Sequence, residues 1–443
     1  MISRLVIKNF KSIGKQGLDI ELKPLTILLG PNGSGKSSII ESLLVLKTKA
    51  KTQFDISNPE GMKEIKTDSM LDLVHKKDNN EWLDIRVDIT PHETNLRDLR
   101  SYFENAKNEL EKILSEIKME KIDNIGYAFS WKAARKESKS SVFLNNIKVM
   151  VSSHSFDKNS KKNKDVFEYP QNFKDIPTEV PASYVLEPRV FRPTTKGWRT
   201  NYLVIFAEEI VTQISSFINQ KMFFVSALRG DIPYVGEGTN PPKWVGIKGE
   251  YSIHILSLLN QRRFKKKKEK IQKWANQFGL EDVSGTWESY NKLTSDYADP
   301  AFGTALNSAL ASHGSKQILP VIIQLFWSDP DNLIMIEEPE ISLHPDSQVL
   351  LPEMFAEAVN DRKQIIVTTH SELLMIGLGT HIRNGLIKPE DVAVYHITKD
   401  SKGSHATRLK ITSKGYVKGW IPSFAELENK LLQEWIQTVP EEE

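Results

Sequence analysis

At the start of the chain the residues alternate between two faces of a predicted strand, with Leu5 and Ile7 on one face and Val6 and Lys8 on the other. A period of two residues is typical of a half-buried strand. The stretch LDIELKP at 18–24 is the expected antiparallel partner. It leads into PLTILLG (24–30), an almost wholly apolar run that predicts a strand buried on both faces. The next stretch, SSIIESLLVL (37–46), has the pattern of a helix.

Strand and helix patterns alternate again late in the chain. The run LIMIE at 333–337 predicts a buried strand, and KQIIVTTHS at 363–371 predicts another. Between them, PDSQVLLPEMFAEAVND at 345–361 has the apolar spacing of one amphipathic helix. These patterns predict an α/β fold with a mixed central sheet and flanking antiparallel strands.

A glycine-rich loop joins the first buried strand to its helix. GPNGSGKS at 30–37 fits G-x-x-x-x-G-K-[ST] at every fixed position. Glycines let the backbone wrap closely around phosphates, so that N–H groups and the helix N-terminus face the anion. Lys36 is expected to reach the β- and γ-phosphates of ATP, and Ser37 to bind Mg²⁺. The expected nucleotide-binding residues of this loop are Asn32, Gly33, Ser34, Gly35, Lys36, Ser37 and Ser38.

Three carboxylates, Glu337, Glu338 and Glu340, stand where the apolar run at 333–336 ends. Taken alone, they fit a solvated strand-to-loop junction. A phosphate loop, however, needs a second strand whose end presents one carboxylate to Mg²⁺ and another that activates water. We therefore interpret Glu337 as the metal-linked carboxylate and Glu338 as the catalytic base.

His370 ends the next predicted strand, 32 residues after Glu338. A single histidine is more often structural than functional. Ligands nevertheless gather at the carboxyl ends of strands in open α/β sheets, and this position predicts a sensor of the γ-phosphate.

Together these motifs resemble those of ABC-type ATPases of the SMC, RecF and OLD-like group. The similarity rests on RLVIKNFKSIG (4–14), GPNGSGKSSIIESL (30–43), LIMIEEPEISLHP (333–345) and IIVTTHS (365–371). It implies an ABC-type P-loop ATPase head in which Glu338 is the hydrolytic base and His370 the switch histidine. It also implies that Lys11 and Ser12 of the opening motif lie beside the nucleotide.

The resemblance further implies a signature segment that completes the nucleotide site of a second subunit. The candidate is SALASHGSKQILPVIIQLF at 308–326, in which Ser312 and Gly314 match an S-x-G core. Leu-Ser-Gly-Gly-Gln is not present as such, and a plain helix cap by Ser312 or Ser315 is the alternative. Gln53 is the candidate Q-loop ligand of Mg²⁺, with SMLDLVHKK at 69–77 as the other candidate region, and EISLHP at 340–345 is expected to reach the second subunit.

Composition and charge indicate the cellular compartment and the kinds of partner. Cysteine is absent, and no apolar run approaches the roughly 20 residues of a membrane span. We expect a cytoplasmic protein without membrane contact. The net charge is only +2, but QRRFKKKKEK at 261–270 carries seven Lys or Arg against one Glu, with smaller basic clusters at 47–51 and 158–164. Such runs fit contacts with DNA phosphates or, equally, solvated helix faces and loops.

Four regions are expected along the chain. Residues 1–95 form an N-terminal ATPase lobe, 96–220 an inserted, mainly helical lid or partner-docking region, 221–420 a C-terminal ATPase lobe, and 421–443 a C-terminal helix with an acidic tail. Within the insertion, 97–122 has the pattern of one long amphipathic helix. Only 73 residues follow His370, so we expect no attached nuclease domain of the kind that some members of the group carry.

The resemblance extends to compact ATPases near OLD and Septu-type defence systems through stretches such as VSALRGDIP at 225–233. It implies an ATPase that dimerises around ATP, as a pair or a larger oligomer, acts on or near DNA and regulates a separately encoded effector such as a nuclease in anti-phage defence. A DNA-repair or chromosome-organising ATPase without a toxic partner is the alternative. The energising subunit of a membrane transporter is a third reading, which the imperfect signature disfavours.

Overall fold

The computed structural model describes residues 1–51, 69–90, 123–135, 137–157, 162–168, 214–230, 232–237, 242–301 and 303–418, together with residues 430, 433 and 434. The predicted helix at 97–122, Gln53 and most of 421–443 lie outside these residues.

A mixed sheet forms the centre of the described chain, with the strand order β18-β17-β16-β3-β15-β14-β9. Its strands from β16 to β9 are parallel, and β17 and β18 extend it antiparallel at one edge. The strands are β3 (Leu25–Leu29), β9 (Met222–Val225), β14 (Leu333–Glu337), β15 (Gln364–Thr369), β16 (Val392–Asp400), β17 (Gly403–Ile411) and β18 (Val417–Lys418). This confirms the predicted α/β class and the three buried strands at 25–29, 333–337 and 364–369.

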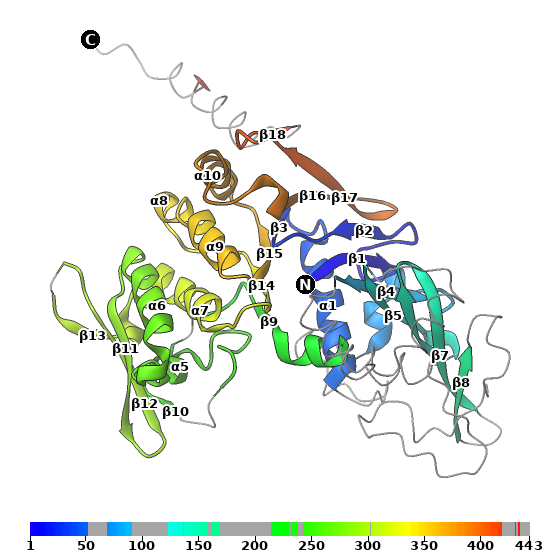
Figure 1. The fold of residues 1–443 in the computed structure, drawn as a ribbon, viewed down its shortest axis with the longest axis horizontal. Coiled ribbons are helices and arrows are strands. Elements are labelled where there is room, and N and C mark those ends of the chain that lie inside the picture. Colours follow the sequence, from blue (N-terminus) through cyan, green and yellow to red (C-terminus); the bar gives the residue numbers. More distant parts are fainter. Residues whose placement is uncertain are drawn as a thin grey trace.

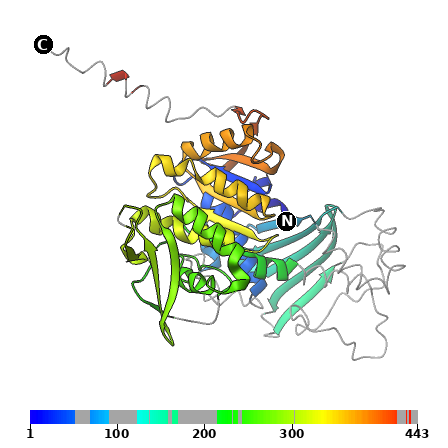
Figure 2. The same cartoon turned by 60° about the vertical axis from the view of Figure 1, so that its left-hand side comes forward.

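The parallel strands are buried on both faces, as their continuous apolar runs predict. Leu28, Met335 and Ile366 belong to one core, which contains helix α1 (Lys36–Lys51). Ile27 and Ile334 point into a second core under helices α7 (His313–Trp327), α9 (Leu351–Asn360) and α10 (Glu372–Arg383). Figures 1 and 2 show these helices on one side of the sheet and the antiparallel strands of the N-terminal half on the other.

A second sheet is wholly antiparallel and has the order β2-β1-β4-β5-β6-β7-β8. It contains β1 (Ile2–Lys8), β2 (Leu18–Glu21), β4 (Leu83–Ile89), β5 (Ile125–Lys132), β6 (Glu137–Leu144), β7 (Ile147–Asp157) and β8 (Lys162–Glu168). Pairing of β1 with β2 is confirmed, and Leu5 and Ile7 are fully buried as the alternation predicts.

The expected mainly helical insertion is corrected for its described part. Most described residues between 123 and 168 are strands, interrupted by the short 3-10 helix Ala133–Arg135 and the turn at 145–146, and 214–221, at the end of the region, are helical. In β5 the large apolar side chains Tyr127, Phe129 and Trp131 are buried at every second position and alternate with half-buried neighbours. This two-residue period extends the sheet begun by β1 and β4.

A third group packs against α7 (Figure 1). It contains helices α5 (Ser252–Leu258) and α6 (Lys265–Gln277). Its strands are β10 (Gly236–Glu237), β11 (Glu281–Ser289), β12 (Lys292–Ala298) and β13 (Ala305–Asn307).

The single helix predicted at 345–361 is two helices. Helix α8 spans Pro345–Gln348, and α9 begins at Leu351 with Pro352 in its first turn. A proline fits there because the first turn needs no N–H partner within the helix, whereas further along it would break the helix. Val349, at the break, is 37% exposed.

Candidate functional site

The phosphate loop joins β3 to α1, as predicted, and holds a buried ammonium. Lys36 is 5% exposed, and its Nζ donates to the carbonyl oxygens of Gly30 (2.8 Å) and Pro31 (3.1 Å). It also lies 2.9 Å from Nε2 of His370 at the end of β15. Burial lowers the pKa of Lys36, and the charges of Glu338, Glu340 and Glu337 oppose this.

Two glycines of the loop are required for different reasons. Gly33 has φ of +72°, a left-handed conformation that side chains disfavour, although a Cβ there would meet no atom within 4 Å. At Gly35 a Cβ would lie 2.3 Å from Oγ of Ser404 and 2.5 Å from Oγ of Ser12. Ser404, from β17, donates to the carbonyl of Ser34 at 2.6 Å and thus supports the loop from outside.

The first carboxylate after β14 faces the loop. Glu337 accepts hydrogen bonds from the hydroxyl of Ser37 and the backbone N–H of Ala227. Burial raises the pKa of Glu337 above its usual value; these two bonds oppose the rise, and the charges of Glu41 and Glu338 add to it. The two residues predicted to share a metal ion therefore lie in contact.

The other two carboxylates contact the end of β15. Oε1 of Glu338 lies 3.4 Å from Nε2 of His370. Oε1 of Glu340 accepts from Oγ1 of Thr369 and from the backbone N–H of His370, both at 2.7 Å. The structure thus brings Lys36, Glu338 and His370 together at the carboxyl ends of β3, β14 and β15, and Glu340 fastens the segment that carries the histidine.

Lys11 and Ser12 also lie beside the phosphate loop. Nζ of Lys11 pairs with Glu41 of α1 at 2.7 Å, and Oγ of Ser12 donates to Oγ of Ser38 at 3.1 Å. Their predicted contact with nucleotide stays a prediction.

The candidate signature residues stand at the start of α7. Ser312 is its N-cap and accepts from the backbone N–H of Ser315 at 3.1 Å, which agrees with the alternative cap reading. A Cβ on Gly314 would lie 2.5 Å from the carbonyl oxygen of Ser342, so this glycine allows the segment after β14 to pack closely. A role of either residue toward the nucleotide of a second subunit stays a prediction.

A family model described as "AAA domain, putative AbiEii toxin, Type IV TA system" matches residues 25–376, the greater part of the chain. The chain belongs to this AAA-domain family. Its fold is that of an SMC head: a structure of the SmcHead bound to the C-winged helix domain of ScpA covers 92% of this chain and 97% of its own, with a TM-score of 0.50 and 13% identity.

Two further comparisons also concern SMC proteins. The Smc head domain of Pyrococcus furiosus, bound to the C-terminal domain of ScpA, matches over 98% of this chain and 99% of its own, with a TM-score of 0.49 and 12% identity. The chromosome partition protein Smc of Methanocaldococcus jannaschii is 48% identical over 52 residues. That match spans 11% of this chain and only 4% of the relative.

The residues of this AAA domain suit a nucleotide and Mg²⁺. Lys36 is a buried cation whose hydrogen-bond partners among the described residues are neutral. Oγ of Ser34 is buried and has no partner within the described chain. No cluster of three or more His, Asp or Glu suited to a metal occurs in the described residues. Ser37 and Glu337, which contact each other, would hold Mg²⁺, with the remaining ligands from phosphates and water, as Mg²⁺ prefers in such sites.

Sequence reasoning gave no role to Arg229, which follows β9 in the AAA domain. Its side chain is buried and donates to the carbonyls of Glu337 (2.7 Å) and Glu338 (3.1 Å). Burial lowers the pKa of Arg229 to about 10, and the charges of Glu340, Glu338 and Glu337 oppose this. The available signal was an arginine four residues after a short apolar strand.

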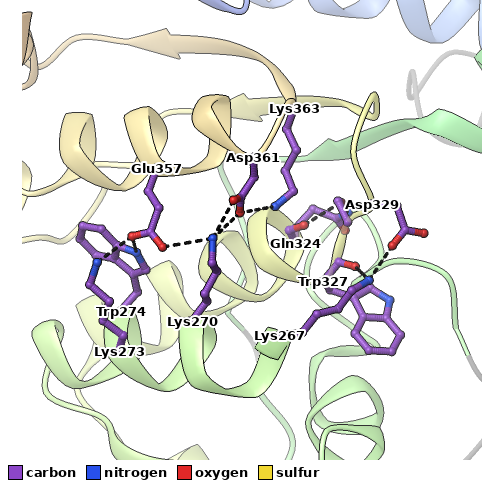
Figure 3. Close-up of polar contacts among 11 residues, drawn as sticks. Lys267, Lys270, Lys273, Trp274, Gln324, Trp327, Asp329, Glu357, Asp361 and Lys363 are labelled. Atoms are coloured by element: carbon purple, nitrogen blue, oxygen red, sulfur yellow. Dashed lines mark hydrogen bonds and ion pairs between the residues drawn. The ribbon is translucent and has the colours of Figure 1, made fainter. Parts of the chain in front are cut away.

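The seven cations of the basic run at 261–270 divide into paired and exposed ones, and among the paired ones Lys268 donates to Oδ1 of Asn260 at 3.2 Å. Lys267 donates to the carbonyl of Trp327 and to Asp329, and Lys270 pairs with Asp361 at 2.6 Å and Glu357 at 3.4 Å (Figure 3). These lysines point from α6 toward α7 and α9, so their charges are used within the protein. Phe264 packs on Trp327 with ring centroids 4.7 Å apart and so anchors the basic run to α7. The cations that remain exposed are Arg262, Arg263, Lys265 and Lys266.

No helix among the described residues combines the length and the apolar character needed to cross a membrane.

Proposed function

We propose that this chain is an ATP-hydrolysing switch that dimerises around nucleotide and acts on or near DNA. The observation that carries the proposal is the meeting of Lys36, His370 and Glu338, with 2.9 Å and 3.4 Å between successive groups, at one edge of the parallel sheet. Lys36 follows β3 through the phosphate loop, and His370 and Glu338 directly follow β15 and β14. These three strands are adjacent in the sheet. Ligands in open α/β sheets bind at this edge.

In this proposal each residue has a separate task. Lys36 and the N–H groups of the first turn of α1 bind phosphate oxygens. Bound Mg²⁺ would supply neutralising charge for the phosphates. Glu338 accepts the proton of the attacking water, and His370 donates toward the terminal phosphate once its proton lies on the nitrogen that faces it.

Dimerisation is proposed from the start of α7 and the loop at 340–345. Gly314 and Ser342 are in close contact, so the two segments form one surface next to the catalytic carboxylates. In ABC-type heads, which this fold resembles, such segments of one subunit meet the nucleotide of the other. A separately encoded partner, such as an effector, is proposed as well, because the family description places the AAA domain in a toxin–antitoxin system, which has a second component.

The proposal is tested by the ATPase rate with and without duplex DNA, and by the solution mass with and without ATP. We expect a magnesium-dependent ATPase whose mass doubles when ATP is bound and hydrolysis is slow. Absence of ATP binding would refute the proposal.

A chromosome-organising or repair ATPase is the second candidate, favoured by the 48% identity to the chromosome partition protein Smc over 52 residues. The two differ in their need for a partner. Co-expression with the products of adjacent genes should be toxic, or should protect against phage, only if the chain regulates an effector; DNA-stimulated hydrolysis without either effect favours the second candidate.

A further inference from the structure

Arg229 uses its whole guanidinium group on backbone carbonyls. Nε donates to Gln317 at 2.8 Å, and Nη1 donates to Ser226 at 2.8 Å and Ala227 at 3.3 Å. Nη1 also reaches the carbonyl of Glu337 at 2.7 Å, and Nη2 that of Glu338 at 3.1 Å. The residue is 3% exposed. A planar fork of five N–H donors allows one side chain to hold several carbonyls at fixed angles.

These carbonyls belong to three chain segments that meet at Arg229. They are its own loop after β9, the end of β14 and the first turns of α7. Gly230 keeps the loop seated on α7, because a Cβ there would lie 2.5 Å from the carbonyl oxygen of Lys316. Arg229 therefore links the helix that begins at the candidate signature segment to the carboxylates after β14.

Glu338 has an unusual backbone that needs such support. Its φ is +44°, in the left-handed region that residues with a Cβ disfavour. Its N–H donates to the carbonyl of Thr368 at 2.9 Å, while its own carbonyl accepts from Arg229. The peptide units on either side of Glu338 are thus held by β15 and by the loop after β9, and the side chain is directed toward His370.

We propose that Arg229 is a positioning residue that holds Glu338 in its left-handed conformation and couples that conformation to the start of α7. The inference rests on the proposed function, in which Glu338 is the hydrolytic base. A displacement of α7 by a second subunit would be transmitted through the carbonyl of Gln317 and the guanidinium to the backbone of Glu338. The group acts on the base without touching the nucleotide, so turnover depends on it and nucleotide affinity does not.

The alternative is a buried arginine that only stabilises the fold. To separate the two, we would compare Arg229→Lys and Arg229→Gln with Arg362→Gln. Arg362 pairs with Asp331 at the opposite end of β14 and is 61% exposed, so it is a control for loss of an arginine. Lysine keeps the charge and loses the fork, which leaves a testable variant if the glutamine variant does not fold.

The first measurement needs no nucleotide hydrolysis. Hydrogen exchange of peptides covering 333–344 should become faster in Arg229→Lys, while peptides from β1 and β4 should exchange as in the wild type. Exchange that is unchanged at 333–344, or faster throughout the chain, would overturn the proposal. Because this readout is independent of turnover, it still tests Arg229 if the wild type proves not to hydrolyse ATP, an outcome that would sink the proposed function instead.

The second experiment measures two quantities for each variant, kcat and the dissociation constant for ATP. We expect kcat of Arg229→Lys to fall by about tenfold or more while the dissociation constant changes by less than about threefold. In a Glu338→Gln background the same substitution should cause almost no further loss, because the residue it positions has already lost its function. A full additional loss in the double variant, or equal losses of affinity and turnover, would mean that Arg229 is structural.

Discussion

Nζ of Lys36 lies 2.9 Å from Nε2 of His370, although the two residues are 334 positions apart in the sequence. An ammonium group only donates hydrogen bonds, so Nε2 of His370 is the acceptor in this contact. A phosphate bound in the loop would compete with His370 for the same ammonium. Binding of nucleotide would then free the histidine to change tautomer or partner.

His370→Ala tests this competition. Because Lys36 loses a competing acceptor, the dissociation constant for ATP should stay the same or decrease, while kcat falls by roughly 10²-fold from the loss of a phosphate donor. Calorimetry and a steady-state ATPase assay measure the two quantities. A weaker affinity with unchanged kcat would contradict a sensor role.

Glu338→Gln should preserve ATP binding and lower turnover by roughly 10²- to 10⁴-fold, because the amide keeps the shape and loses the basic group. The slow variant should also accumulate as an ATP-bound dimer, detectable by light scattering. Glu390→Gln, an exposed carboxylate in the short helix Pro389–Asp391, is the matched control. Wild-type turnover in Glu338→Gln would remove this residue from its proposed role.

Lys36→Ala removes the buried ammonium of the phosphate loop. Charge-assisted hydrogen bonds of this kind contribute about 1.5–3 kcal/mol, so ATP affinity should fall roughly ten- to hundredfold. Lys15→Ala serves as control, since its side chain is 77% exposed and pairs with Glu81. If calorimetry gave the same affinity for Lys36→Ala and wild type, the loop would be only a turn.

Glu337→Gln should change stability in a pH-dependent way. Burial raises the pKa of Glu337 in the folded state above 4.5, so its contribution to stability is present below about pH 4.5 and is lost as pH rises through the raised pKa. At pH 8 without metal, the variant should therefore melt at a higher temperature than the wild type, and the difference should shrink on acidification. With Mg²⁺ and ATP the order should reverse, because only the wild type has the carboxylate ligand. If Glu337→Gln instead melted at a lower temperature than the wild type without metal, the charge of the Glu337 carboxylate would already be compensated in the folded protein, which contradicts the prediction.

The exposed cations of the basic run are the candidates for DNA contact. Replacing Arg262, Arg263, Lys265 and Lys266 by Gln should weaken duplex binding and flatten its salt dependence, by about 0.9 in the slope for each lost phosphate contact. The control with the same charge change replaces Lys388, Lys399, Lys410 and Lys414, all exposed. Lys267 and Lys270 are left intact because they bind α6 to its neighbours. If both fourfold variants showed the same salt dependence of duplex binding, the DNA-contacting surface would lie outside the basic run.

The sequence predicted those parts of the site in which local pattern and chemistry coincide. At three places a buried apolar strand is directly followed by polar groups. These are the strand before the loop at 30–37, the strand that ends at Glu337 and the strand before His370. Arg229 was missed because its five acceptors are backbone carbonyls, which no residue pattern records.

Two other differences between the sequence-based expectations and the structure also depend on packing and pairing, which the residue pattern does not record. The division of the basic run depends on which lysines face α9, and this is decided by packing rather than composition. The strands at 123–168 were missed because their alternation is broken by a turn and polar positions, so that only pairing with β4 makes them a sheet.

The position of β3 in the central sheet has a consequence for synthesis of the protein. On one side Leu25 is in register with Ile365, and on the other with Val392. When the phosphate loop leaves the ribosome, both strands that will flank β3 are still untranslated, and its apolar residues have no sheet to join. Folding with so many long-range contacts is slow, and the nucleotide site forms only after nearly 400 residues are made. A nascent or prematurely ended chain would thus carry the complete phosphate-loop sequence and still be unable to bind ATP.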